Sequence, residues 1–308
     1  MYKYLWVLIF AYQYTNACDF CGCAPSASSA DVASLQPQSM IGIAYGYRSF
    51  DFQESDVELK KTKVMNYSLN AAYAPVKWMD IRLNLPLLWM KNYYAITDEN
   101  SVSTESRAGL GDMQLFANFK AWSKPGMGEK KVGQQLNFGF GLELPTGRKR
   151  VSQNELLQDL NFGSQSVDYL FSGIYSLSIR KWGITQSGFV KINTRNKESV
   201  KFGNIYTYQL LGNYSAGIKK SMLVPTAGFK IEVASRNLNK NIIQQRSGYW
   251  VYSLAYGISW MKKNWKITGQ VQHPLAQLTS KGEITQKTNF NINFSYQFLN
   301  KKTKQTQK

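Results

Sequence analysis

The final stretch of the chain, residues 288–298, limits the possible folds more than any other part of the sequence. From Phe290 onward every even-numbered residue is large and apolar, and every odd-numbered residue is polar. Strict alternation places one face of a β-strand in an apolar medium and the other in a wet one. The apolar face is largely aromatic, which suits lipid better than a tightly packed protein core. If the strand faces lipid, the earlier parts of the chain should repeat its pattern.

Earlier segments do repeat the alternation, and their charged residues keep to the polar face. These segments are residues 40–50, 64–75, 78–92, 112–122, 134–145, 167–180, 182–195, 206–219, 223–236, 248–261 and 265–273. Phe116 is the one large apolar residue of segment 112–122 on the polar face. With the final stretch there are about twelve strands, an even number, as a closed antiparallel barrel with both ends on one side requires. We therefore predict an all-β fold, a transmembrane antiparallel β-barrel over residues 39–298.

The lengths of the connections give an independent indication of the same fold. Long connections (51–63, 93–111, 146–166, 196–205, 237–247, 274–287) alternate with short ones (76–77, 181, 220–222, 262–264), and 123–133 is of medium length. Outer-membrane barrels have long external loops and short periplasmic turns. Most tryptophans also lie near segment ends, where aromatic girdles meet lipid headgroups. We expect the chain to lie in a bacterial outer membrane, in contact with the lipid bilayer.

Composition is compatible with a membrane barrel and excludes little by itself. The mean hydropathy is −0.35, which is low for a helical membrane protein but expected when only alternate residues face lipid. The net charge is +18, which raises the question of nucleic acid as a partner. The basic residues are spread over loops, turns and the C-terminal tail, so we expect no nucleic-acid binding.

The first 17 residues are typical of an export signal. One basic residue, Lys3, precedes an apolar run that is too short to span a bilayer, and Ala17 is a small residue at the expected cleavage point. We predict a signal peptide over 1–17 and, over 18–38, a flexible leader rich in Ala, Ser and Pro.

All three cysteines lie in this leader, at Cys18, Cys21 and Cys23. Cys18 and Cys21 are better spaced for a disulfide than neighbours two residues apart. Cys18 would become the first residue after cleavage, where lipid could be attached. Three thiolates could also bind a soft ion, Cu(I) or Zn(II). The residues favour disulfide or lipid over metal and leave all three open, and we expect no other cofactor.

Three glycine-containing motifs carry a resemblance to a known family. They are Gly109-Leu110-Gly111-Asp112, Leu144-Pro145-Thr146-Gly147, and Asn161-Phe162-Gly163-Ser164 with Asp168. They resemble recurrent motifs of outer-membrane proteins named for the MetA pathway of phenol degradation, and the cysteine-rich start resembles a subgroup of such transporter-like barrels. The resemblance implies an outer-membrane channel for small solutes, with hydrophobic or aromatic compounds as the indicated class.

The end of the barrel carries a second resemblance. Closing strands of such barrels commonly end on a Phe that the outer-membrane assembly machinery reads. Phe298 stands in that position, but a basic tail over 299–308 follows it.

The charged residues on the polar faces of the predicted strands are the candidates for lining the lumen. They are Arg48, Arg82, Asp112, Lys120, Glu143, Asp168, Lys191, Lys230 and Glu232, with Arg180 and Arg195 as further cations. Antiparallel pairing should bring Asp112 and Glu143 together at the loop-side rim, with Asp168 nearby. A structural ion-pair network is favoured over a defined substrate site. The many Gly, Ala, Ser and Asn residues of the same face should leave space along the axis.

Two functional classes follow, and enzymatic activity is not expected. His273 is the one histidine, and no nucleophile motif accompanies it. We expect passage of small solutes through the barrel. The alternative is a non-conducting barrel with a binding or structural role, whose leader binds metal or a periplasmic partner.

Overall fold

A computed structural model describes residues 38–53, 59–95, 102–125, 132–147 and 162–298. The expected signal peptide and basic tail lie outside these residues, as does the leader with its three cysteines, apart from Gln38. Among the described residues, no helix is long and apolar enough to cross a membrane.

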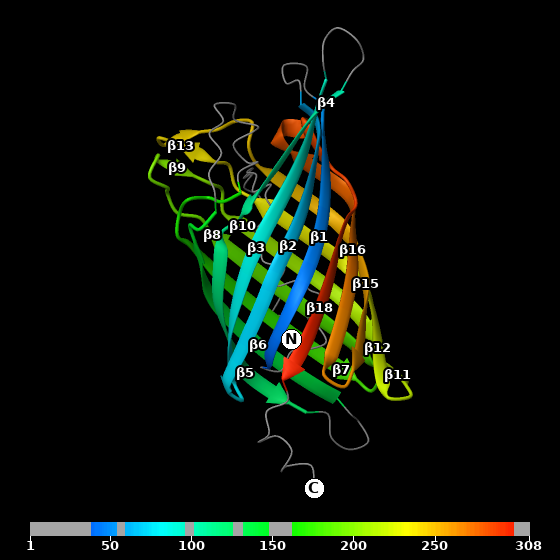
Figure 1. Ribbon diagram of the computed structural model, residues 1–308. Helices are drawn as coiled ribbons and strands as arrows, with labels where there is room; N and C mark the ends of the chain where they lie inside the picture. The colour runs from blue at the N-terminus through cyan, green and yellow to red at the C-terminus, as the bar shows by residue number, and fades with distance from the viewer. Residues whose placement is uncertain (1–37, 54–58, 96–101, 126–131, 148–161, 299–308) are drawn as a thin grey trace, which may run out of the picture.

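The described residues form an antiparallel β-barrel of 12 strands (Figure 1). The strands of the wall are β1 (Ser39–Phe52), β2 (Leu59–Val76), β3 (Met79–Ala95), β4 (Val102–Leu110), β5 (Met113–Lys124), β6 (Val132–Leu144), β7 (Asp168–Ile179), β8 (Trp182–Ile192), β10 (Ile205–Tyr214), β11 (Ala216–Ile218), β12 (Ser221–Ala234), β15 (Tyr249–Lys262), β16 (Trp265–Thr279), β17 (Ile284–Gln286) and β18 (Asn289–Phe298). At three places in the wall, two consecutive elements together form one strand of the barrel. β4 and β5 both pair with β3, β10 and β11 both pair with β12, and β17 and β18 both pair with β1.

The barrel closes between its first and last strands. β1 pairs with β2 along one edge and with β18 along the other, and Ser39 lies opposite Phe298. Closure pairs the two edges that an open sheet would leave free, which a strand surrounded by lipid requires. The predicted antiparallel barrel is confirmed.

The two ends of the barrel differ. The end that holds Ser39 and Phe298, here the turn end, joins its strands through short turns such as the one between Ile179 and Trp182. The opposite end, here the loop end, carries the long connections and a small sheet of β9 (Val200–Lys201), β13 (Leu238–Asn239) and β14 (Ile242–Ile243) (Figure 1). A short 3-10 helix, η2 (Ser280–Gly282), also lies among these connections. The alternation of long and short connections agrees with the sequence-based expectation.

At the loop end the wall is taller than predicted. Region 93–111 was expected to be a loop, but most of it belongs to β3 and to β4, which pair from Leu87 opposite Leu110 to Ala95 opposite Val102. The sequence of β4 lacks apolar alternation, because both of its faces are largely exposed to water at this height. Periodicity therefore could not mark it as a strand.

The outward face is a belt of exposed apolar side chains. Leu254 is 43% exposed, whereas its neighbour Ser253 points inward and is 3% exposed. Aromatic residues contact one another across strands on this face, as Tyr45 does with Tyr67 at a ring separation of 5.1 Å. An apolar belt around a closed barrel is stable in a bilayer and would be unstable in water, which places the barrel in a membrane.

The interior is polar toward the turn end, and toward the loop end it holds an apolar cluster beside buried polar groups. Near the turn end it holds buried groups such as Thr185 and Lys266. Near the loop end, inward side chains from several strands form a packed cluster, here the apolar cluster: Phe50, Phe52, Leu59, Val64, Leu88, Met90, Phe162, Ile205, Ala234, Tyr249, Val251 and Ile284. At this end the inward residues are therefore larger than the Gly, Ala, Ser and Asn that were expected to leave space along the axis.

Phe116 has a structural explanation. It is buried on the inward face, and a Cβ on Gly139 or Gly141 of the neighbouring strand would overlap its ring. The ring thus covers two glycines, which explains an aromatic residue on the otherwise polar face.

Candidate functional site

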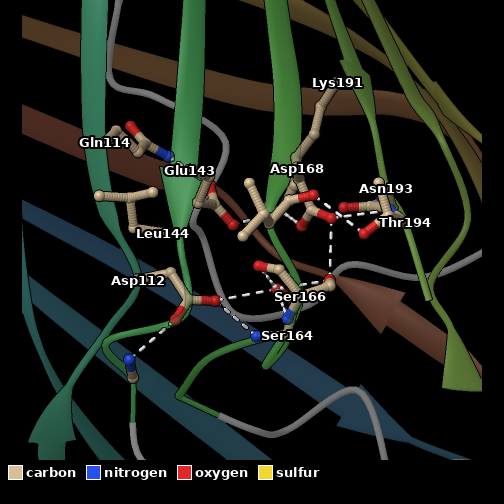
Figure 2. A network of polar contacts seen from close by, with 12 residues as sticks. Asp112, Gln114, Glu143, Leu144, Ser164, Ser166, Asp168, Lys191, Asn193 and Thr194 are labelled. Atoms are coloured by element: carbon tan, nitrogen blue, oxygen red, sulfur yellow. Dashed lines mark hydrogen bonds and ion pairs between the residues drawn. The ribbon is translucent and has the colours of Figure 1, made fainter. Parts of the chain in front are cut away.

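The most extensively connected polar groups in the wall lie where β5, β6, β7 and β8 approach the loop end (Figure 2). Glu143 of β6 lies directly opposite Asp168 of β7. Lys191 of β8 reaches both, with its Nζ 2.6 Å from Glu143 Oε1 and 3.7 Å from Asp168 Oδ2. None of the three is more than 1% exposed. The alternation of each strand directs these side chains inward, and antiparallel register brings them together.

Neutral groups add hydrogen bonds to the two carboxylates. Gln114 donates to Glu143 Oε2 at 2.7 Å, and Asn84 donates to the Gln114 side-chain oxygen at 3.1 Å. Asp168 Oδ1 accepts hydrogen bonds from Ser166 Oγ and from the backbone N–H of Thr194, each at 2.8 Å. Buried charges are tolerated when they are paired and hydrogen-bonded in this way.

Asp112 forms a second centre in the bend between β4 and β5. Its Oδ1 accepts the backbone N–H of Gly147 at 2.8 Å, and its Oδ2 accepts both the N–H (2.6 Å) and the hydroxyl (3.0 Å) of Ser164. One carboxylate thus joins the β4–β5 bend to the end of β6 and to the segment that precedes β7. Ser166 links the two centres, because its hydroxyl oxygen lies 3.0 Å from Ser164 Oγ and 2.8 Å from Asp168 Oδ1.

The glycines of the three motifs are explained by this convergence. A Cβ on Gly147 would lie 2.8 Å from Asp112 Oδ1, and one on Gly163 would overlap the same carboxylate. On Gly109, a Cβ would lie 2.6 Å from the ring of Phe162. The backbone can approach Asp112 and Phe162 this closely only without side chains at these positions. The motifs therefore meet at one place in the fold.

Phe162 connects the polar network to the interior of the barrel. Its ring belongs to the apolar cluster, while Ser164, two residues later, is held by Asp112. The segment 162–166 is thus held at one end by apolar packing and at the other by hydrogen bonds. A carboxylate that accepts several hydrogen bonds can position such a segment firmly.

The structure brings together some of the predicted lumen residues and separates others. Glu143, Asp168 and Lys191 meet as expected for an ion-pair network. Asp112 was expected near Glu143 at the rim; Gln114 lies directly opposite Glu143, and Asp112 lies two residues earlier, just before β5 begins. The polar partners Gln114, Ser164 and Ser166 were missed by the sequence analysis, although Gln114 shares the inward parity of Glu143.

The other predicted charges form smaller groups. Lys230 and Glu232 of β12 pair at 2.5 Å, and Glu232 also accepts the Tyr249 hydroxyl at 2.6 Å. Arg82 and Asp80 pair at 2.7 Å nearer the turn end.

The remaining predicted cations are divided between the interior and the surface. Arg48 lies opposite Val64 on the inward side of β1, and Lys120 lies opposite Asn137, both partly exposed. Arg180 is an exposed turn residue and Arg195 an exposed loop residue that contacts Asn241, so neither lines the lumen as predicted.

The arrangement of these polar groups suits the positioning of segment 162–166 and a polar inner wall better than it suits catalysis. No group of three His, Cys, Asp or Glu side chains suited to a metal occurs within the described ranges. His273 is exposed and its Nδ1 lies 2.7 Å from the Thr288 hydroxyl. The cysteines proposed as metal or disulfide residues lie outside the described residues.

A sequence model of a known family matches residues 50–224, more than half of the chain. The chain belongs to the family named for the MetA-pathway of phenol degradation. The match covers all three motifs around Asp112, Gly147 and Ser164. No curated protein matches the chain.

Three solved structures are similar to this family member to different degrees. An outer-membrane channel from Pseudomonas putida F1 superposes with a TM-score of 0.60 at 17% identity, over 86% of this chain and 97% of that one. A monoaromatic hydrocarbon channel, CymD, gives a TM-score of 0.40 at 9% identity, over 93% and 95% of the two chains. The β domain of the Bordetella autotransporter BrkA gives 0.48 at 8% identity, over 85% and 100%. The first of these supports the outer-membrane barrel fold.

Proposed function

We propose that the protein is an outer-membrane channel through which small apolar solutes, with monoaromatic compounds as the size class, enter the cell. The observation that supports this proposal is the apolar cluster inside the loop end of the barrel. Barrels that pass hydrophilic solutes have a polar, water-filled interior, whereas here large buried residues such as Leu88 and Met90 face inward. An apolar solute can exchange contacts with such side chains without losing hydrogen bonds. The turn end would face the periplasm and the loop end the exterior, as in other barrels of this kind.

The polar network would have a supporting role in this proposal. It holds segment 162–166, and through it Phe162, beside the solute path. Charges that are already paired, such as Lys191 with Glu143, leave little reason for an ionic solute to bind there. The proposed activity is passage and involves no bond-making or bond-breaking step.

Uptake by cells tests the proposal. Cells that express the full chain should accumulate a radiolabelled monoaromatic hydrocarbon faster than cells with an empty vector. Val251→Thr keeps the volume but places a hydroxyl in the apolar cluster, and we expect it to lower uptake severalfold. Thr185→Val, which reverses the change at a buried inward position near the turn end, should leave uptake unchanged.

A second candidate is a barrel that conducts nothing and binds a partner or ligand. The observation that favours it is the tight burial of the apolar cluster, in which Leu59, Leu88 and Ile205 have no exposed surface. Hydrocarbon uptake equal to that of the empty vector, in cells that contain folded protein, would favour this role over passage.

A further inference from the structure

The turn end of the barrel carries a ring of exposed cations. The ring consists of Lys77 in the β2–β3 turn, Lys124 at the end of β5, Arg180 and Lys181 between β7 and β8, Lys219 and Lys220 between β11 and β12, and Lys262 and Lys263 between β15 and β16; we call it the cationic rim. Among the described residues of this end, the acidic side chain is Asp80, which is buried and paired with Arg82. Exposed charge among the described residues of this end is therefore positive.

Three of these turns place a cation at a backbone position that favours glycine. Arg180, Lys219 and Lys263 have φ values of 57°, 51° and 53°, and each is the first residue of a two-residue turn. Glycine adopts this left-handed conformation without steric cost, whereas a residue with a Cβ is disfavoured. A long cation stands in all three positions in place of glycine. The conformation of the turn does not explain that choice, whereas a need for positive charge would.

Aromatic neighbours place the cationic rim at the height of lipid headgroups. Trp78 follows Lys77 directly and is 54% exposed, and Trp182 follows Lys181 and is 67% exposed. Trp265 lies two residues beyond Lys263 and contacts Tyr296 edge to face at a ring separation of 4.8 Å. Exposed tryptophans of membrane barrels lie at the boundary between the acyl chains and the headgroups. The anions available to cations at this boundary are lipid phosphates.

We propose that the cationic rim binds anionic phospholipids of the periplasmic leaflet through their phosphate groups. The distribution of the cations favours lipid over a soluble acidic protein. They occur in turns around the circumference (Figure 1), which matches a shell of lipids that surrounds the barrel. A protein partner would instead need a patch on one side. Lys and Arg attract an anionic membrane surface more strongly as their number increases.

The test compares two variants, one altered at the turn end and the other altered at the loop end. The rim variant replaces Lys181, Lys219, Lys262 and Lys263 with Gln. The control variant replaces Lys60, Lys197, Lys240 and Lys281, four exposed lysines of the loop end, with Gln. Each set removes four charges, and each contains two residues with left-handed φ. Heat-modifiable migration on gels verifies that both full-length variants are folded.

Native mass spectrometry then measures lipid binding to the purified proteins in mixed micelles that contain phosphatidylglycerol or phosphatidylcholine. We expect the unaltered protein and the control variant to prefer phosphatidylglycerol, and the rim variant to lose this preference by on the order of tenfold. Equal binding of both lipids by the unaltered protein would overturn the proposal, as would an equal loss in both variants. Binding of polyglutamate without a preference for phosphatidylglycerol would assign the rim to a soluble acidic partner and overturn it as well.

Single glycine substitutions separate lipid binding from turn formation. Lys219→Gly and Lys263→Gly remove a cation and also relieve the left-handed conformation. We expect an unchanged or higher melting temperature together with weaker binding of phosphatidylglycerol. A lower melting temperature with full retention of the lipid preference would show that these lysines serve the turns alone and would contradict the proposal.

Discussion

Gly163 lies at a close contact of the loop end that leaves no room for a side chain. Its backbone lies against the carboxylate of Asp112, so that the following N–H, from Ser164, can donate to Asp112 Oδ2 at 2.6 Å. Any Cβ at this position would overlap the carboxylate. A side chain here would therefore weaken the hydrogen bonds that position the segment before β7.

Gly163→Ala tests this contact. Overpacking of a tight contact typically costs about 1–3 kcal/mol, and we expect a loss of that size in the free energy of unfolding, measured by denaturant titration in a lipid bilayer. Gly188→Ala is the matched control, because a Cβ there has nothing within 4 Å. Losses of the same size in both variants would show that Gly163 is not specially constrained.

Lys191 is the one cation between two buried carboxylates of the site. Lys191→Met removes it and leaves Glu143 and Asp168 without their shared partner. Removing one partner of a buried ion pair typically costs about 3–5 kcal/mol, so unfolding should occur at a much lower denaturant concentration. The triple variant Lys191→Met, Glu143→Gln, Asp168→Asn should recover most of the loss; a triple variant as unstable as the single one would contradict the ion-pair account.

The outward residues have a different constraint, which is contact with lipid. Leu254→Arg places a charge in the apolar belt, where the cost is about 2–4 kcal/mol at the bilayer midplane. Ile242→Arg is the control, because Ile242 is 73% exposed in β14, in the small sheet of the loop end. Equal stability of the two variants in lipid bilayers would contradict the assignment of the belt.

At the scale of elements, the segment 162–166 links the wall to the interior. Asp112 holds it through Ser164, and the packing of Phe162 holds its other end. We expect Asp112→Ala to increase hydrogen exchange at Ser164 and Ser166 by at least about tenfold, because the Ser164 amide loses its acceptor and the Ser164 hydroxyl, which accepts from the Ser166 amide, loses its partner. Exchange in β12, which does not contact Asp112, should stay unchanged. Unaltered exchange at both serines would mean that apolar packing alone holds the segment.

Most wall strands could be predicted from the sequence because one of their faces meets lipid and the other does not. Where that contrast is absent, prediction failed. β4 is exposed on both faces, so its polar sequence appeared to be a loop. At the start of β15, Tyr249 and Val251 alternate with Trp250 and Tyr252, so both faces are apolar and the inward cluster was not visible.

The candidate site could be predicted in part for a similar reason. Inward parity placed Glu143, Asp168 and Lys191 on the same surface, and antiparallel pairing brought them together. The partners of Asp112 could not be predicted, because Asp112 lies outside the strands and its partners, Gly147 and Ser164, come from a connection without periodicity. Such contacts depend on tertiary structure and leave no regular signal in the sequence.

At the scale of the whole molecule, the orientation of the barrel follows from its two ends. We expect a cysteine placed at exposed Ser103, in β4, to react with a membrane-impermeant maleimide in intact cells. A cysteine placed at Lys181, in the turn end, should react only after the outer membrane is permeabilised. Because the natural cysteines lie in the expected leader, each variant is compared with the unaltered protein. The reverse pattern of labelling would invert the proposed orientation.

The central proposal is that apolar solutes pass through the interior of the barrel, and the most direct test is to locate a solute within it. A photoreactive diazirine analogue of a monoaromatic hydrocarbon, activated in native outer membranes, should label the residues Leu88, Tyr249 or Val251 themselves, with the modified residue located by tandem mass spectrometry. Excess unlabelled hydrocarbon should compete with this labelling but not with labelling from the bilayer. Competable labelling of the apolar cluster is the predicted result; labelling confined to outward residues such as Leu254, insensitive to competition, would contradict passage through the barrel.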